Sequence, residues 1–379
     1  MHILMTANAT WNVWNFRQSL VQALLNDGCH VTVLAPLDDA VDDLEAAGCR
    51  VLPIKIDAKG LNPIENLGLM YRFKRLFRAE RPDIVLSYTV KNNLFGAMAA
   101  RTLGIPFIPN VTGLGTAFLS SPLLEILVKT LYRRAFCKLP IVFYQNKDDR
   151  DLFIKNRLIR TDQARLLPGS GVDLTRFAAV PLPTEQLPSI FLMVARLLRD
   201  KGVFEFVQAA RRIKTHHPEI RFQLLGATES DNRTAINAAT VQRWVDEGVI
   251  EYLGTASDVR PCIAAASCVV LPSYREGAPR TLIEAAAMSR PLIATDVPGC
   301  RAVVDDEVSG LLCLPRSADS LAAAIERFLT LPHNTRVAMG QAGRTKMERE
   351  FDEIFVIRAY REAVAAVMRS STKYANMLN

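Results

Sequence analysis

The chain has 379 residues, of which 49% are hydrophobic and 22% charged, and this composition excludes disordered and fibrous proteins. Its length is sufficient for two domains that each bury a core. The formal net charge of +7 favours anionic partners such as nucleotide diphosphates, lipid phosphates or an anionic membrane surface. The Lys and Arg residues are scattered, only 7% of the residues are aromatic, and no nucleic-acid module is recognisable, so no nucleic-acid partner is expected.

The cysteines and histidines indicate a reduced, metal-free protein. The seven cysteines are odd in number and widely spaced and form no C-x-x-C motif, so we expect buried thiols and a cytoplasmic location. The five histidines lack metal-ligand spacing, and no metal site is expected. The N-terminus does not have the pattern of a signal peptide. Prolines and glycines interrupt the uncharged stretch 102–124, so no membrane-spanning helix is expected.

Short β-branched runs alternate with helical patterns in the first half of the chain. Strands are predicted at 30–35, 82–87 and 141–144, and helices at 16–27 and 123–136. Alternation of this kind is typical of a parallel sheet with crossover helices on both faces. We therefore predict a first Rossmann-like domain at 1–168.

Three prolines interrupt the alternation in the segment 169–189, which is predicted to be a linker. The alternation resumes with strands at 190–194 and 220–225, and a helix at 202–214 between them. This gives a second Rossmann-like domain at 190–350, and a helical stretch at about 350–369 is predicted to pack back on the first domain. The predicted fold class is α/β, with ligands bound at the carboxyl ends of the strands.

The segment Glu276-Gly-Ala-Pro-Arg-Thr-Leu-Ile-Glu284 carries two carboxylates eight positions apart. A strand-like run precedes it and a small-residue helix follows, so Glu276 is expected at the mouth of a cleft that also receives the N–H groups of 281–283. A sugar nucleotide, with hydroxyl groups and a diphosphate, suits such a site. The alternative is that Thr281 and Glu284 form a capping box and that Glu276 is a solvated loop residue.

Arg196 and Lys201 directly follow the predicted strand 190–194, at the same sheet edge as Glu276. A diphosphate leaving group needs positive charge as its bond to the sugar breaks, and Arg, Lys and a helix N-terminus can supply it without a metal. Solvated loop charges are the alternative. Thr255, at another strand end, could contact a nucleotide base.

Two further motifs are assigned structural roles. Pro168-Gly-Ser-Gly171-Val-Asp173 lacks the third Gly of a dinucleotide-binding motif and is predicted to be a hinge turn. Asp149-Arg-Asp151 has the D-x-D form that metal-dependent sugar transferases use. It lies at a predicted helix start, where helix capping explains it better.

With these residues in view, the chain resembles the family-4 retaining glycosyltransferases of the GT-B fold over nearly its full length. The motifs Glu276-x7-Glu284, Arg196 with Lys201-Gly202, and Gly171-Val-Asp173 stand in the family's order and spacing. The resemblance implies two Rossmann-like domains facing across a cleft, and transfer of a hexose from a UDP-sugar without cofactor or metal.

The resemblance also implies roles for the site residues. Glu276 would contact the hydroxyl groups of the donor sugar, and Glu284 those of the ribose. Arg196 and Lys201 would neutralise the diphosphate, helped by the backbone amides of Thr281 and Leu282. The family's proposed retaining route is a front-face reaction in which the departing phosphate oxygen takes the acceptor proton.

In its first half the chain is most similar to bacterial transferases that add N-acetylhexosamine to undecaprenyl-diphosphate-linked sugars, including the type that places N-acetylgalactosamine on diacetylbacillosamine. The similar stretches are 15–17, 91–96, 112–115 and, later in the chain, 272–276. They imply that Arg17, Lys91 and Thr112 contact the lipid-linked acceptor. The first loop, Thr6-Ala-Asn-Ala-Thr10, departs from the family's Gly-Gly, and the family's acceptor-side histidine is absent, so no side-chain base is assigned.

Two basic amphipathic stretches lie in this half, at 72–78 and 122–136. They suit a peripheral contact with anionic lipid on the inner face of the plasma membrane. They are equally compatible with ordinary crossover helices whose apolar stripes pack on the sheet.

Two other functions stay open. A UDP-sugar epimerase on the same fold would eliminate and re-add UDP with acid and base side chains, and the lack of well-placed histidines argues against it. A non-catalytic sugar-nucleotide-binding protein would not need the full set of Glu276, Glu284, Arg196 and Lys201.

Overall fold

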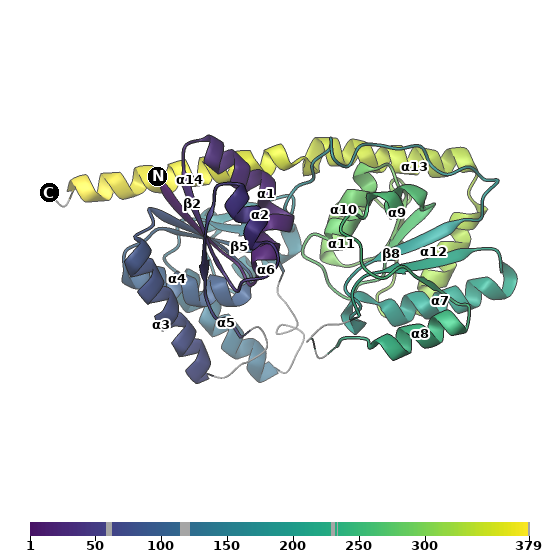
Figure 1. The fold of residues 1–379 in the computed structure, drawn as a ribbon, viewed down its shortest axis with the longest axis horizontal. Helices are drawn as coiled ribbons and strands as arrows, with labels where there is room; N and C mark the ends of the chain where they lie inside the picture. The colour runs from purple at the N-terminus through teal and green to yellow at the C-terminus, as the bar shows by residue number, and fades with distance from the viewer. Residues whose placement is uncertain (58–62, 114–121, 229–231, 233, 378–379) are drawn as a thin grey trace. The chain divides into compact units, whose positions relative to one another are not determined.

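The computed structural model of the protein, which describes residues 1–57, 63–113, 122–228, 232 and 234–377, contains two parallel β-sheets (Figure 1). Each sheet belongs to its own compact unit. The first unit comprises Met1–Ser170 and Glu353–Asn379, and the second comprises Gly171–Asp352. The predicted α/β class with two Rossmann-like units is confirmed.

The sheet of the first unit has seven strands in the order β3-β2-β1-β4-β5-β6-β7. Its central strands are buried along their whole length, as β4 is, because helices cover both faces of a parallel sheet. The strands are β1 (His2–Thr6), β2 (His30–Ala35), β3 (Arg50–Pro53), β4 (Ile84–Tyr88), β5 (Phe107–Val111), β6 (Val142–Tyr144) and β7 (Ala164–Leu166).

Two separate apolar clusters fill the two faces of this sheet. One contains side chains of α1, α2 and α14, and the other contains side chains of α3, α4, α5 and α6. A π-helical turn at Asn92–Gly96 leads into α4. The helices are α1 (Thr10–Asn26), α2 (Val41–Ala46), α3 (Pro63–Glu80), α4 (Ala97–Thr102), α5 (Pro122–Phe136), α6 (Lys147–Lys155) and α14 (Glu353–Met377).

The last helix, α14, belongs to the first unit although it follows the second in sequence. Val356, Tyr360 and Val364, spaced four residues apart on one face, are buried in the cluster with α1. The Arg361 guanidinium binds the Asp27 carboxylate with an Nε–Oδ2 distance of 2.7 Å. The helical stretch expected at about 350–369 is this helix.

Helix α1 begins at Thr10 rather than at the predicted Phe16. The carboxylate of Asp38, from the loop after β2, accepts hydrogen bonds from the Trp11 N–H and the Thr10 hydroxyl. A capping group distant in sequence therefore satisfies the first turn, and no local sequence pattern reveals it.

The sheet of the second unit has six strands in the order β10-β9-β8-β11-β12-β13. The strands are β8 (Ile190–Val194), β9 (Arg221–Leu225), β10 (Glu251–Tyr252), β11 (Cys268–Leu271), β12 (Leu292–Thr295) and β13 (Gly310–Cys313). The helices are α7 (Val203–His216), α8 (Ala238–Asp246), α9 (Arg260–Ala265), α10 (Arg280–Ala287), α11 (Pro298–Val303), α12 (Ala318–Thr330) and α13 (His333–Lys346). In the described part of the chain, no helix has the length and apolar content needed to cross a bilayer.

The segment predicted to be a linker, 169–189, is instead packed on the second unit from Gly171 onward. Phe177 is buried in that unit's core. The Arg290 guanidinium is fully buried and donates to the carbonyl oxygens of Val180 and Pro181. The prolines that suggested a linker mark an extended segment whose backbone is anchored through its carbonyl groups.

Arg290 holds this segment to the rest of the unit. Its guanidinium also donates to the Met288, Ala264 and Ala266 carbonyl oxygens at 3.3 to 3.4 Å. Burial lowers the pKa of this guanidinium to about 10. A charged group without a carboxylate partner is tolerated there because the backbone carbonyl groups satisfy its donors.

We predict that Arg290→Met lowers the free energy of unfolding by about 3 kcal/mol or more, because several buried carbonyl groups lose their donor together. Urea unfolding followed by circular dichroism measures the change. The matched control is Arg211→Met, since Arg211 forms an exposed ion pair with Glu247. An equal, small loss in both variants would show that Arg290 does not hold the segment.

Candidate functional site

The strand order of the second sheet reverses between β8 and β11, which pair in parallel. Arg196 and Lys201 follow β8, and Glu276 follows β11. The carboxyl ends of parallel strands lie at one edge of a sheet, and ligands of this fold class bind where the strand order reverses. The second unit therefore places the predicted cations and carboxylate at its switch point.

The loops after β8 and β11 are joined by an ion pair. The Lys201 Nζ lies 2.5 Å from the Glu276 Oε1, and the two side chains are 22% and 11% exposed. The Tyr274 N–H donates to the Asp200 carbonyl oxygen at 2.9 Å, so the backbones of the loops are tied as well. The ion pair and the backbone hydrogen bond thereby hold the two charged groups together, and both groups are still partly exposed to solvent.

Two glycines permit this close approach. Gly202 has a φ of +76°, and a Cβ there would lie 2.0 Å from the Pro272 carbonyl oxygen. A Cβ on Gly299, at the start of α11, would lie 2.6 Å from the carbonyl oxygen of Glu276. A side chain at Gly202 would push the loops after β8 and β11 apart, and one at Gly299 would push α11 away from the loop that carries Glu276.

The capping-box interpretation of Thr281 and Glu284 is wrong. Pro279 is the N-cap of α10, and the Thr281 hydroxyl donates to the Val194 carbonyl oxygen of β8 at 3.0 Å. The Leu282 N–H donates to Pro279, whereas the Thr281 N–H has no acceptor among the described residues. Of the two amides expected to meet the diphosphate, that of Thr281 is the one free for a ligand.

Glu284 lies one turn into α10 and is paired within the helix. The Arg280 Nε lies 2.5 Å from the Glu284 Oε1, and the Glu284 side chain is only 12% exposed. Burial raises the pKa of the Glu284 carboxyl, and Arg280 and Arg176 partly offset this shift. The carboxylate is a strong acceptor held in a poorly hydrated place, which suits hydroxyl groups as partners.

The two remaining donor-side residues are exposed. The Arg196 guanidinium has no hydrogen-bonding or ionic partner in the part of the chain that the structure describes. Thr255 follows β10, at the same sheet edge but two strands from β8. The structure therefore places Glu276, Lys201 and Arg196 at the switch point of the sheet, and Thr255 two strands away along the same edge.

The sequence analysis missed three residues around these groups. Arg280 is one, although its i, i+4 spacing to Glu284 was visible in the motif. Arg176, whose charge acts on both Glu284 and Asp258, could not be found from spacing. The third, Cys300, lies close enough to Glu276 for that carboxylate to add to the burial that raises the pKa of the thiol.

The first sheet also has a switch point, between β1 and β4. Asn92 is fully buried there, and its Nδ2 donates to the Thr6 hydroxyl at 2.7 Å and to the Ala7 carbonyl oxygen at 3.0 Å. Lys91 lies beside it and donates to the Asp57 carbonyl oxygen. Thr112 follows β5 at the same edge. Two of the three predicted acceptor residues therefore lie at one edge of the first sheet.

The third, Arg17, lies inside α1 and is 7% exposed. Its guanidinium stacks on the Tyr88 ring, with 3.7 Å from Cζ to the ring centroid, and donates to the Asn12 side chain at 2.7 Å. The structure places this cation in the packing of α1 against the end of β4.

The D-x-D motif lies at the start of α6. The Asn146 side chain accepts a hydrogen bond from the Asp149 N–H and donates to its carboxylate. Asp149 is buried, whereas Asp151 pairs with Arg150 at the surface. Within the described ranges, no group of three or more His, Cys, Asp or Glu side chains could hold a metal ion.

Comparisons with known proteins match both halves of the chain. Residues 2–146 match the family model "Glycosyl transferase 4-like", and residues 180–346 match "Glycosyl transferases group 1". The chain is 24% identical to the N,N'-diacetylbacillosaminyl-diphospho-undecaprenol alpha-1,3-N-acetylgalactosaminyltransferase of Campylobacter jejuni, covering 98% of this chain and 100% of that protein.

Two further matches agree with these. The UDP-Gal:alpha-D-GlcNAc-diphosphoundecaprenol alpha-1,3-galactosyltransferase of Escherichia coli is 27% identical, over 77% of each chain. The crystal structure of Anabaena HepE in complex with UDP-glucose is 16% identical and superposes with a TM-score of 0.78, covering 97% of this chain and 100% of that one.

The raised pKa of Glu284 predicts the pH dependence of stability. Because its folded pKa lies above the unfolded value, its contribution is complete below the unfolded pKa and is lost as the pH rises through the folded pKa. Glu284→Gln should therefore gain stability relative to the wild type as the pH rises from the unfolded pKa of about 4.3 through the raised folded pKa. Urea unfolding at several pH values measures the difference.

Glu251→Gln is the control with the opposite sign. Its pairing with Arg221 lowers the pKa of the Glu251 carboxyl. The wild type therefore gains stability as the pH rises through that lowered pKa to the unfolded value of about 4.3, and Glu251→Gln should lose stability relative to it over this lower pH range. A Glu284→Gln difference that stays constant with pH would contradict the burial of a charged carboxylate at this position.

Proposed function

The chain belongs to the glycosyltransferases of the GT-B fold, and on that premise we propose that it transfers an N-acetylhexosamine, with retention, from a UDP-sugar to a polyprenyl-diphosphate-linked saccharide. The observation that carries the proposal is the Lys201–Glu276 pair at the switch point of the second sheet. It combines an acceptor for sugar hydroxyl groups with a cation for the diphosphate. The reaction would belong to bacterial glycan or polysaccharide biosynthesis.

The second unit would bind the donor. Glu276 accepts hydrogen bonds from the sugar hydroxyl groups, and Glu284 accepts them from the ribose. Arg196, Lys201 and the Thr281 N–H bind the diphosphate, with α10 adding the partial positive charge of its N-terminus. Arg196 is exposed and its side chain has no partner among the described residues, so it is available for this contact. The Anabaena structure with UDP-glucose bound supports the donor class.

These cations would also stabilise the leaving group. Negative charge grows on the diphosphate as its bond to the sugar breaks, and Arg196 and Lys201 are placed to offset it, so the proposed reaction uses no metal. The departing phosphate oxygen takes the proton of the acceptor hydroxyl in the front-face route. The protein would then position the two substrates rather than supply a base.

The first unit would bind the acceptor, at the carboxyl ends of β1, β4 and β5. Lys91 and Thr112 lie at this edge, and Asn92 fixes the backbone of the loop after β1. The two curated relatives are both named for sugars linked to diphosphoundecaprenol, which supports an acceptor of this class. N-acetylhexosamine as the transferred sugar rests on the Campylobacter relative.

The same unit would touch the membrane through α3 and α5, which flank α4 on one face of the sheet (Figure 1). Helix α3 buries Leu69, Phe73 and Phe77, so it is an ordinary crossover helix on that side. Its first turns nevertheless expose Leu67 and Tyr71, which are 62% and 68% exposed. Exposed apolar side chains on a basic helix suit the interface of an anionic bilayer at the cytoplasmic face.

We predict that Glu276→Gln lowers the turnover number about a hundredfold and changes the Kd for UDP much less, because the lost contact is to the sugar rather than to the nucleotide. Radiolabelled transfer to a polyprenyl-diphosphate-linked saccharide, with EDTA present, measures turnover, and calorimetry measures UDP binding. Glu247→Gln, an exposed carboxylate paired with Arg211, is the control.

Two results of these assays would count against the proposal. Equal activity of Glu276→Gln and Glu247→Gln would remove Glu276 from the reaction. Conversion of UDP-N-acetylhexosamine to its epimer in the absence of any acceptor would favour an epimerase instead.

We predict that Leu67→Gln with Tyr71→Gln weakens binding to phosphatidylglycerol vesicles about tenfold, through loss of apolar burial. Vesicle flotation measures the bound fraction. Leu187→Gln is the matched control, because Leu187 is also 62% exposed but lies in the second unit. Unchanged binding of the double variant would show that α3 does not enter the interface.

A further inference from the structure

A pocket of about 380 Å³ lies in the first unit, at the amino ends of β5 and β6. Thr112 follows the other end of β5, roughly 16 Å away for a strand of five residues at about 3.3 Å each. The pocket therefore lies at the opposite edge of the sheet from the proposed acceptor residues. Its lining comes from α4, α5, α14 and the loops before β5 and β6.

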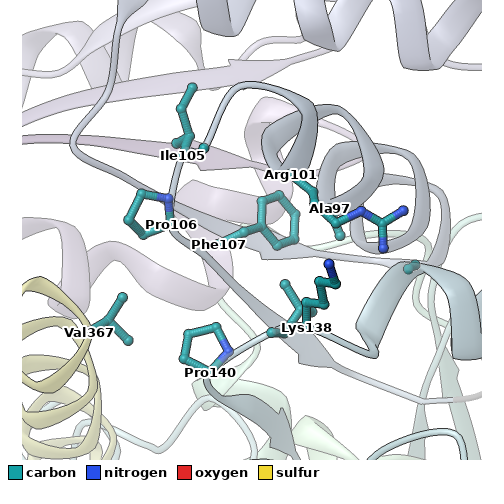
Figure 2. Close-up of a pocket in the computed structure, with 11 residues that line it drawn as sticks. Ala97, Arg101, Ile105, Pro106, Phe107, Lys138, Pro140 and Val367 are labelled. Carbon is teal, nitrogen blue, oxygen red and sulfur yellow. The ribbon is translucent and has the colours of Figure 1, made fainter. Parts of the chain in front are cut away.

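The wall of the pocket is apolar except for two cations. Figure 2 shows the head groups of Arg101 and Lys138 on one side of the Phe107 ring, with Pro140 and Val367 on the other. Among the residues that the structure describes, no Asp or Glu lines the pocket. A ligand inside would thus meet an apolar floor at one end and positive charge at the other.

The two cations lack counter-charges. Lys138 forms no hydrogen bond or ion pair with any described residue, and it is exposed. Arg101 uses only its Nη1, which donates to the Arg134 carbonyl oxygen and lies 3.5 Å from the Cys137 Sγ. This hydrogen bond satisfies a carbonyl group in the last turn of α5. That role leaves the other nitrogen atoms of Arg101, and the whole Lys138 ammonium, available.

We propose that this pocket binds an anionic amphiphile that has a short hydrocarbon chain and a phosphate head. The chain would lie over Phe107 and Val367, and the head would be bound by Arg101 and Lys138. A phosphate that carries an alkyl chain, such as n-octyl phosphate, or the first part of a longer lipid phosphate has both of these parts. The proposal does not depend on the proposed function.

Because Val367 belongs to α14, the ligand would contact the returning helix as well as the sheet. Binding there stabilises the docked position of α14 by mass action. An anionic lipid bound in this pocket would therefore favour the form of the first unit in which α14 is packed on the sheet.

The test is calorimetric titration of the full chain with n-octyl phosphate below its critical micelle concentration, compared with inorganic phosphate and 1-octanol. We expect saturable binding of one n-octyl phosphate, and affinity that rises about fourfold per methylene from butyl to octyl phosphate and then levels off. Phosphate alone and octanol alone should each bind at least tenfold more weakly. Equal binding of either one would overturn the assignment of an amphiphile.

Two variants locate the binding. Arg101→Gln with Lys138→Gln should weaken n-octyl phosphate at least tenfold and leave UDP binding unchanged. Arg133→Gln with Arg134→Gln is the matched control. These substitutions remove the same charge, and both side chains are exposed and do not line the pocket. Equal weakening by both pairs would mean general electrostatic attraction and would overturn the site.

The reactivity of Cys137 reports on binding without any substitution in the residues that line the pocket. It is exposed and lies beside Arg101, so a bound head group should slow its reaction with a thiol reagent at least threefold. A Cys137→Ser variant identifies its signal among the seven thiols. An unchanged Cys137 rate at saturating n-octyl phosphate would place the ligand elsewhere, including at the proposed acceptor site.

Discussion

The contact between Lys201 and Glu276 is the interaction on which the second unit's site depends. It joins the loops of the two strands between which the strand order reverses, and it holds opposite charges in side chains that are mostly shielded from water. In such surroundings each charge is costly without the other, so the pair fixes both loops. Gly202 allows the backbones of these two loops to approach each other, and Gly299 allows α11 to approach the backbone of Glu276.

In the first unit, neutral groups hold the loops at the switch point together. Asn92 crosses the switch point between β1 and β4 and bonds the loop after β1 through its amide. A buried amide with satisfied donors holds the loop without introducing charge. One unit thus presents a charged edge suited to a diphosphate and sugar, and the other an edge whose loop conformation is set by uncharged hydrogen bonds.

Most of the fold and the centre of the site followed from sequence, because alternation of strands and helices and the order of strand-end motifs depend on local pattern. The strand 190–194 and the placement of Arg196, Lys201 and Glu276 at one edge of the sheet are examples. Features that depend on distant partners did not follow. Burial of Arg17 against Tyr88, and anchoring of 171–189 by Arg290, arise from contacts between residues far apart in sequence. The alternative of a capping box at α10 was also wrong, because the Thr281 hydroxyl donates to the Val194 carbonyl oxygen of β8 and not to its own helix.

The position of α14 has a consequence for how the protein is made. Residues 1–170 leave the ribosome first, yet one face of their sheet is covered only by α1 and α2 until Val356, Tyr360 and Val364 have been synthesised. The second unit, continuous in sequence, can complete its core before then. The domain that begins first therefore finishes last, and during translation its apolar face is a surface that chaperones can bind.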